Sequence, residues 1–147
     1  MSKIAFERAF QELSEAEVAT LLVRSRRLDF EEDAKIMRES ENQQRILVIL
    51  EGEVAVVRLG ADGQETELSK PLGPGDTVGE MSFIDDMGAS ATLIARSRVS
   101  VKAIDKELID SMKADNPTFA ERFYLSLLYT VIRRLRVLDY KMAYGED

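Results

Sequence analysis

Two short aliphatic runs in the middle of the sequence constrain the fold most. Arg45–Glu51 reads Arg-Ile-Leu-Val-Ile-Leu-Glu and Val54–Leu59 reads Val-Ala-Val-Val-Arg-Leu, with Gly52 between them. Both runs are short, aliphatic and rich in β-branched residues, which predicts two strands. The centre of the chain is therefore predicted to be β-structure.

Turn signals divide the rest of the central region into further short strands. Gly60–Gly63 predicts a turn, and Pro71–Asp76, with the sequence Pro-Leu-Gly-Pro-Gly-Asp, is the sharpest break in the chain. Residues 98–103 alternate polar and apolar side chains, as a half-buried strand does. Many short strands between turn signals are typical of a sandwich, barrel or jelly roll, and we predict an eight-stranded β-roll. Further strands are expected at residues 65–68 and 91–95.

Both ends of the chain are predicted to be helical, which makes the fold class α+β. Ser14 and Glu17 form a capping-box pattern that predicts the start of a helix. Asp105 is the expected N-cap of a short helix over residues 106–114. Apolar residues recur at helical spacing near the N-terminus, at Ile4, Phe6, Phe10 and Leu13.

A long helix is predicted at the C-terminal end. Asn116-Pro117 supplies a cap residue followed by an N1 proline, and nothing interrupts the helix from Pro117 to about Ala143. One set of its apolar residues keeps the alternating spacing of a helix–helix seam: Leu125, Leu128, Ile132 and Leu135. A second set lies on neighbouring faces that could cover the β-roll: Phe123, Leu127, Val131 and Leu138.

Two arrangements fit this apolar surface. The helix either packs flat on its own domain or is shared between the β-roll and a second copy of the chain. We predict the second arrangement, a homodimer through the C-terminal helix.

The composition excludes several function classes. The 147 residues suit one domain, and they contain no cysteine and no histidine. Disulfides, thiolate metal sites, a cysteine nucleophile, a histidine base and a serine triad are therefore excluded, as is the histidine-bound metal of jelly-roll oxygenases. We expect no enzyme activity, no catalytic residue and no metal site, and we interpret the acidic clusters Glu31–Asp33 and Asp85-Asp86 as solvated.

The charge and the apolar content indicate where the chain works. The net charge of −7, from 20 basic and 27 acidic residues, disfavours nucleic acid and anionic lipid as partners. The sequence shows no apolar run of membrane-spanning length, and residues 1–10 do not look like a signal peptide. We expect a cytoplasmic protein without nucleic-acid or membrane partners.

The segment from Gly73 to Leu93 carries the strongest functional signal. It combines a glycine suited to close backbone approach, Gly79, with an acid, Glu80, and with the small residues Gly88–Ala91. Backbone N–H groups there suit an anion, and a carboxylate suits ribose hydroxyls. The residues alone leave open whether the segment binds a small ligand or is a solvent-exposed hairpin loop.

The sequence resembles the cyclic-nucleotide-binding domains of the catabolite activator protein and protein kinase A regulatory subunit type. The resemblance runs from about Phe10 to Leu135. It rests on Phe10–Glu17, Ile49–Val56, Leu72–Asp76, Val78–Phe83, Ser90–Thr92, Asn116-Pro117 and Arg122-Phe123.

The resemblance implies a phosphate-binding cassette from Gly79 to about Thr92. By this resemblance, Glu80 of the present chain would bind the ribose 2′-hydroxyl, and Ser90 and Ala91 would contact the cyclic phosphate. The family's Pro-Arg pair, whose arginine binds the phosphate, is here Gly88-Ala89. The implied ligand-binding residues are Gly79, Glu80, Met81, Ser82, Ala89, Ser90 and Ala91.

The missing arginine predicts weak or altered ligand binding. A charge-assisted phosphate contact contributes about 1.5–3 kcal/mol, so its loss corresponds to a roughly tenfold to several-hundredfold weaker affinity. From Pro71 to Ala95 the sequence has acids and no lysine or arginine, which predicts a negative field for the phosphate. The cations that could replace the arginine are Arg58, Lys70, Arg96, Arg133, Arg134 and Arg136.

The prediction for function is a non-catalytic cyclic-nucleotide-binding-like regulatory module, with cAMP or cGMP as the possible ligand and no other cofactor. The alternative is a ligand-independent dimeric interaction or scaffold protein with a vestigial pocket and an unknown protein partner. Because the sequence stops at Asp147, no helix-turn-helix DNA-binding domain is expected. The expected parts are N-terminal helices at 1–24, the β-roll at 25–104 with its cassette at 79–92, and C-terminal helices at 105–147.

Overall fold

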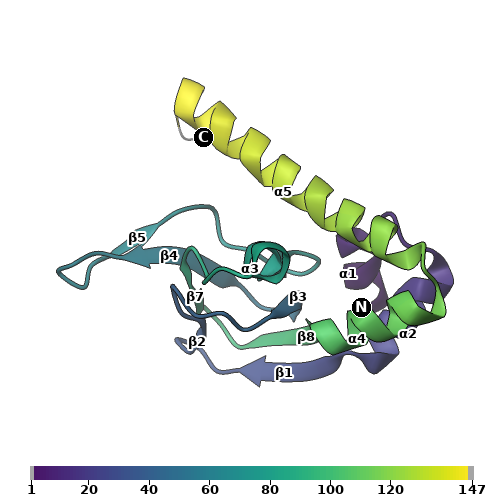
Figure 1. The fold of residues 1–147 in the computed structure, drawn as a ribbon. Coiled ribbons are helices and arrows are strands. Elements are labelled where there is room, and N and C mark those ends of the chain that lie inside the picture. The colour runs from purple at the N-terminus through teal and green to yellow at the C-terminus, as the bar shows by residue number, and fades with distance from the viewer. Residues whose placement is uncertain (1, 146–147) are drawn as a thin grey trace.

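The computed structural model describes residues 2–145, which fold into two antiparallel four-stranded sheets flanked by helices (Figure 1). This confirms the predicted eight-stranded β-roll with N-terminal helices, a short helix and a long C-terminal helix. In chain order the elements are α1 (Ser2–Ala9), α2 (Glu15–Arg24), β1 (Arg26–Phe30), β2 (Lys35–Met37), β3 (Arg45–Glu51), β4 (Val54–Leu59), β5 (Glu65–Glu67), β6 (Thr77–Val78), α3 (Glu80–Asp85), β7 (Thr92–Ala95), β8 (Val99–Asp105), α4 (Lys106–Asp115) and α5 (Phe119–Tyr144). The strand orders are β1-β8-β3-β6 and β2-β7-β4-β5.

Strand β3 is buried on both faces, which explains why its sequence is continuously apolar. Ile46 and Val48 face the helices, and they belong to one hydrophobic core with Ile104 of β8. Leu47 and Ile49 point the opposite way, into the core between the two sheets. A strand covered on both faces needs apolar side chains at every position and does not alternate.

The core beneath the helices is built around aromatic rings. Phe123 of α5 stacks on Phe10 and Phe119 with ring centroids 5.4 and 5.5 Å apart, and it meets Phe83 of α3 edge to face at 6.2 Å. These rings and Phe6 of α1 are each at most 1% exposed. One core therefore joins α1, α3 and α5. Ile4, which was predicted to share the apolar face of the first helix, is instead 67% exposed.

Helix α5 is packed over only its first half. It begins at Phe119, two residues later than predicted, and the Asn116 side chain accepts a hydrogen bond from the Thr118 N–H at 3.2 Å. The last buried residue of the helix is Thr130, and the part of α5 beyond it projects outward above the β-roll (Figure 1). Within residues 2–145, no helix combines the length and apolar character needed to cross a membrane.

The predicted second apolar set on α5 is only partly correct. Phe123 and Leu127 are fully buried, as expected of residues that cover the fold. Val131 is half-buried, and Leu138 is exposed because it lies on the part of the helix beyond Thr130.

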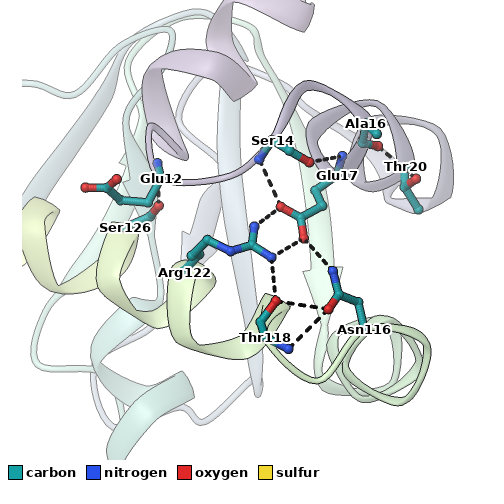
Figure 2. A network of polar contacts seen from close by, with 9 residues as sticks. All are labelled: Glu12, Ser14, Ala16, Glu17, Thr20, Asn116, Thr118, Arg122 and Ser126. Atoms are coloured by element: carbon teal, nitrogen blue, oxygen red, sulfur yellow. Dashed lines mark hydrogen bonds and ion pairs between the residues drawn. The ribbon is translucent and has the colours of Figure 1, made fainter.

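A polar network ties α2 to the start of α5 (Figure 2). The predicted capping box is present, because the Ser14 hydroxyl accepts from the Glu17 N–H and the Glu17 carboxylate accepts from the Ser14 N–H. The same carboxylate accepts two hydrogen bonds from the Arg122 guanidinium. Asn116 and Thr118 complete the network around this ion pair. Glu17 thus serves both its own helix cap and the attachment of α5.

We expect Glu17→Gln to lower the thermal unfolding midpoint at pH 7. The hydrogen bonds from Arg122 hold the pKa of the Glu17 carboxyl below its ordinary value of 4.5. A carboxyl whose pKa is lower in the folded state stabilises the fold above its unfolded pKa, and this stabilisation is lost as the pH falls through the folded pKa. The difference in midpoint from the wild type should therefore be largest near neutral pH and shrink below pH 4.5. Thermal melts monitored by circular dichroism between pH 3 and 7 measure it.

The matched control for this prediction is Glu15→Gln. The Glu15 side chain is 81% exposed and forms one surface ion pair with Lys3 at 3.5 Å, so its loss should have little effect. A Glu17→Gln deficit of equal size at pH 3 and pH 7 would show that the carboxylate charge is not what stabilises this contact.

Candidate functional site

A cavity of about 670 Å³ lies between α5 and the β-roll. Most of its lining residues come from α1, from the chain between β5 and α3, from α3 itself, from residues 89–91 and from the second half of α5. Strands of the β-roll contribute Met37, Val56 and Leu93. The predicted seam residues Leu125, Leu128, Ile132 and Leu135 do not line it. All seven predicted ligand-binding residues do: Gly79, Glu80, Met81, Ser82, Ala89, Ser90 and Ala91.

Gly79 places Glu80 inside the structure. It has a φ of 89°, in the left-handed region that favours glycine, and a Cβ atom there would collide with the Arg45 carbonyl. This tight passage turns the chain from β6 into α3. Glu80, the first residue of α3, is consequently only 4% exposed although it is charged.

The Glu80 carboxylate is paired with an arginine from α5. Arg134 donates a hydrogen bond to Glu80 Oε1 and another to the Thr77 carbonyl. Burial raises the pKa of the Glu80 carboxyl above its usual range, and the positive charge of Arg134 opposes that rise. Glu80 Oε2 and the Thr77 hydroxyl are both buried and have no partner of good hydrogen-bond geometry within residues 2–145. The neighbouring Thr77 side chain nevertheless lowers the pKa of the Glu80 carboxyl by hydrogen bonding. The Glu80 carboxylate therefore retains acceptor capacity on its second oxygen, and a ligand hydroxyl can use it once that buried oxygen becomes accessible from the cavity.

The strand-entry segment after α3 offers neutral groups to the cavity. Gly88 packs directly on the backbone of Ser40, and Ala89 exchanges backbone hydrogen bonds with Ser40 and Glu41 at 2.8 and 2.9 Å. Within the described residues, the backbone N–H groups of Ser90 and Ala91 donate to no carbonyl. These groups and the Ser90 hydroxyl can bind a polar ligand atom, whereas Ala89 contributes only a methyl group.

The predicted negative field is wrong for the cavity as a whole. Among the described residues that line it, five are basic and only two, Asp76 and Glu80, are acidic. Asp76 is engaged in its own loop, where it accepts from the Gly73 N–H at 2.9 Å, and Glu80 is paired with Arg134. The basic residues come from α1, the segment after β5, and α5: Arg8, Lys70, Arg133, Arg134 and Lys141.

The structure shows which of the cations proposed to replace the missing arginine line the cavity and which do not. Arg58 pairs with Glu39 at 3.0 Å and Arg96 pairs with Glu65 at 2.9 Å, and neither lines the cavity. Arg136 points elsewhere on α5 and is not a lining residue. Lys70, Arg133 and Arg134 are the predicted candidates that reach the site.

Comparison with known proteins identifies the fold family. The family model described as "Cyclic nucleotide-binding domain" matches residues 27–116, which include the strands and the whole segment around Glu80. This chain belongs to the cyclic nucleotide-binding domain family.

Several relatives are similar over most of this chain. The CRP-like cAMP-activated global transcriptional regulator of Mycobacterium tuberculosis is 28% identical over 134 residues, which are 91% of this chain and 58% of that protein. The chain thus spans less than two thirds of that relative's length. The Thermus thermophilus catabolite activator protein has a TM-score of 0.75 at 27% identity, over 92% of this chain and 62% of that one. A cyclic nucleotide-binding domain from Methylobacillus flagellatus shares the fold with a TM-score of 0.81 at 23% identity, over 96% and 83% of the two chains.

Two basic residues of this cyclic nucleotide-binding domain escaped the sequence analysis. Arg8 lies on α1 and packs its side chain over Gly75, and Lys141 lies near the end of α5. Both line the cavity, although both are far from residues 79–92 in sequence. No local pattern marks them, since only the folding of α1 and α5 over the β-roll brings them to the site.

Proposed function

We propose that this chain is a non-catalytic regulatory module that binds a small nucleotide in the cavity between residues 79–92 and α5. The observation that carries the proposal is Glu80, a buried carboxylate that lines a cavity of about 670 Å³, is held there by Arg134 and keeps acceptor capacity on its second oxygen. A ribose hydroxyl is a suitable donor for that oxygen, and the hydrogen bond would remove the cost of leaving it unsatisfied. The cAMP-activated relative supports a cyclic nucleotide as the ligand class.

Two contacts connect the ligand site to α5. Arg134 of α5 holds the Glu80 carboxylate directly. Phe83, on the same short helix as Glu80, packs against Phe123 of α5. A ligand hydroxyl on Glu80 adds a partner beside Arg134 and shifts α3, and either change alters the preferred position of α5. Ligand binding then biases an equilibrium between two positions of this helix.

The output we propose is a change in the geometry of a homodimer formed through α5. Leu128 and Leu135 are 51% and 55% exposed, Leu125 is exposed as well and Ile132 is half-buried, so the predicted seam faces away from the cavity. Within this proposal the chain acts as one cytoplasmic domain, made up of the three expected parts at residues 1–24, 25–104 and 105–147. An unidentified protein partner would recognise the changed geometry of the dimer.

Ala89 supports a second candidate function. If position 89 is where the family has its phosphate-binding arginine, the cavity has lost its main phosphate contact. The chain would then be a dimeric interaction protein whose pocket is vestigial.

Calorimetric titration with cAMP and with cGMP separates the two candidates. For the regulatory module we expect saturable binding, weakened about tenfold or more by Glu80→Ala because a hydrogen bond to a charged group contributes about 1.5–3 kcal/mol. Asp85→Ala is the matched control, since Asp85 is an exposed acid on the same helix that does not line the cavity. Sedimentation with and without ligand measures the dimer. Absence of binding by either nucleotide at millimolar concentration, with the dimer intact, would contradict the regulatory proposal and leave the interaction protein.

A further inference from the structure

Two adjacent arginines on α5 differ in how their charge is compensated. Arg134 is neutralised by Glu80. Arg133 also lines the cavity, but within the described part of the chain its guanidinium donates only to the neutral hydroxyl of Thr130, at 3.3 Å. It forms no ion pair with a carboxylate of residues 2–145. The cavity wall therefore presents a positive charge whose other N–H groups are available to a ligand.

Arg133 belongs to a stripe of α5 that faces the cavity. The lining residues Arg133, Arg134, Val137, Leu138 and Lys141 follow one side of the helix, and the stripe is about 12 Å long at 1.5 Å per residue. Its middle is apolar and each end carries a basic side chain. Residues 89–91 on the cavity wall supply the free backbone N–H groups of Ser90 and Ala91 and the Ser90 hydroxyl, but no cation.

The charge of the whole chain makes this arrangement informative. The protein carries a net charge of −7, yet among the described residues around the cavity the charged ones are mainly basic, five against two acids. Such a local concentration of positive charge in an acidic protein attracts anionic ligands to that place. A guanidinium without a carboxylate partner is suited to phosphate, because it can donate two parallel hydrogen bonds to two phosphate oxygens.

We infer that Arg133 of α5 supplies the cationic contact to the ligand phosphate that residues 88–91 lack, and that the free backbone N–H groups of Ser90 and Ala91 face the same phosphate. The inference rests on the proposed nucleotide-binding function and specifies its ligand: a phosphorylated nucleoside whose hydroxyl meets Glu80 and whose phosphate faces α5. Its base would then lie against the apolar middle of the stripe, at Val137 and Leu138. The phosphate is a cyclic diester or a free monoester, and both groups suit the guanidinium equally.

The test uses three probes that share base and ribose: adenosine, AMP and cAMP. Calorimetric titration of the wild type should give at least one of the phosphorylated probes an affinity tenfold or more above that of adenosine. The tighter of AMP and cAMP identifies the phosphate as monoester or diester. Arg133→Gln should remove most of this advantage and leave adenosine binding unchanged. Arg136→Gln is the matched control, because Arg136 is an exposed arginine of the same helix outside the cavity.

The outcomes separate this inference from the proposed function. Equal affinity for adenosine and both phosphorylated probes overturns the inference, as does an equal effect of Arg133→Gln and Arg136→Gln, and both results leave a ligand-binding module. If the wild type binds cGMP instead, guanosine, GMP and cGMP replace the three probes. If it binds none of these compounds, the proposed function falls together with the inference. Arg133 is exposed, so melts of both variants should match the wild type and show that folding is not the cause.

Discussion

Replacing Phe123 with alanine is expected to lower the free energy of unfolding by about 3–5 kcal/mol, the usual cost of removing a fully buried phenylalanine ring. Phe123 is 0% exposed and lies at the centre of the aromatic core. Its ring contacts those of Phe10, Phe83 and Phe119, so the substitution opens a cavity lined by groups from three parts of the chain. A loss of this size is a large part of the 5–15 kcal/mol that a typical domain has.

Urea unfolding followed by circular dichroism measures the effect. Met142→Ala is the control on the same helix, because Met142 is 80% exposed and its removal should change stability by less than about 0.5 kcal/mol. Phe123→Leu retains most of the apolar volume and should lie between the two, which keeps the comparison possible if the alanine variant does not fold. A loss below about 1 kcal/mol for Phe123→Ala would contradict the assignment of this ring to the centre of the core.

The same substitution tests the connection between α3 and α5. In the proposed mechanism Phe83 transmits changes at Glu80 to α5 through its contact with Phe123. Phe123→Leu should therefore weaken the effect of a ligand on the dimer more than it weakens ligand binding itself.

The strands that the sequence predicted are those with a strong local pattern. β3 and β4 are aliphatic runs bounded by turn signals, and they were predicted with the bounds that the structure has. β2 and β6 contain three and two residues, which is too short for any periodicity to be recognised. β1 reads Arg-Arg-Leu-Asp-Phe and is an edge strand with mostly exposed residues, so its strand character depends on pairing with β8.

The functional site likewise combines residues that a local motif predicts with residues that only the folding of the chain brings together. The motif around Gly79 and Glu80 is local, and all residues expected from it lie on one cavity. The charge of that cavity could not be predicted from the sequence, because its basic residues are far from Glu80 along the chain. Most of the β-roll sequence lies between Arg8 and Glu80, and Arg133 follows Glu80 by more than fifty residues. The prediction of a negative field counted only neighbours in sequence, whereas the electrostatic potential depends on neighbours in space.

Ala89→Arg is expected to raise the affinity for cAMP by roughly tenfold to several hundredfold. The prediction follows from the resemblance, which implies that position 89 is where the family has an arginine for the cyclic phosphate. A charge-assisted contact of about 1.5–3 kcal/mol corresponds to this range of affinities. Ala89 lines the cavity and is only half-buried, so a longer side chain can extend from it. Gly88 should be left unchanged, since a Cβ atom there would collide with the Ser40 backbone.

The control is Ala89→Gln, which adds a side chain of similar length without the charge. Only the arginine variant should bind cAMP more tightly, and its affinity for adenosine should stay the same because adenosine has no phosphate. The gain should also persist when Arg133 is changed to glutamine, since the new arginine would hold the phosphate from position 89. Equal gains for adenosine and cAMP, or for the glutamine and arginine variants, would show that position 89 does not face a phosphate. The resemblance would then hold for the fold and for Glu80 but not for the phosphate site.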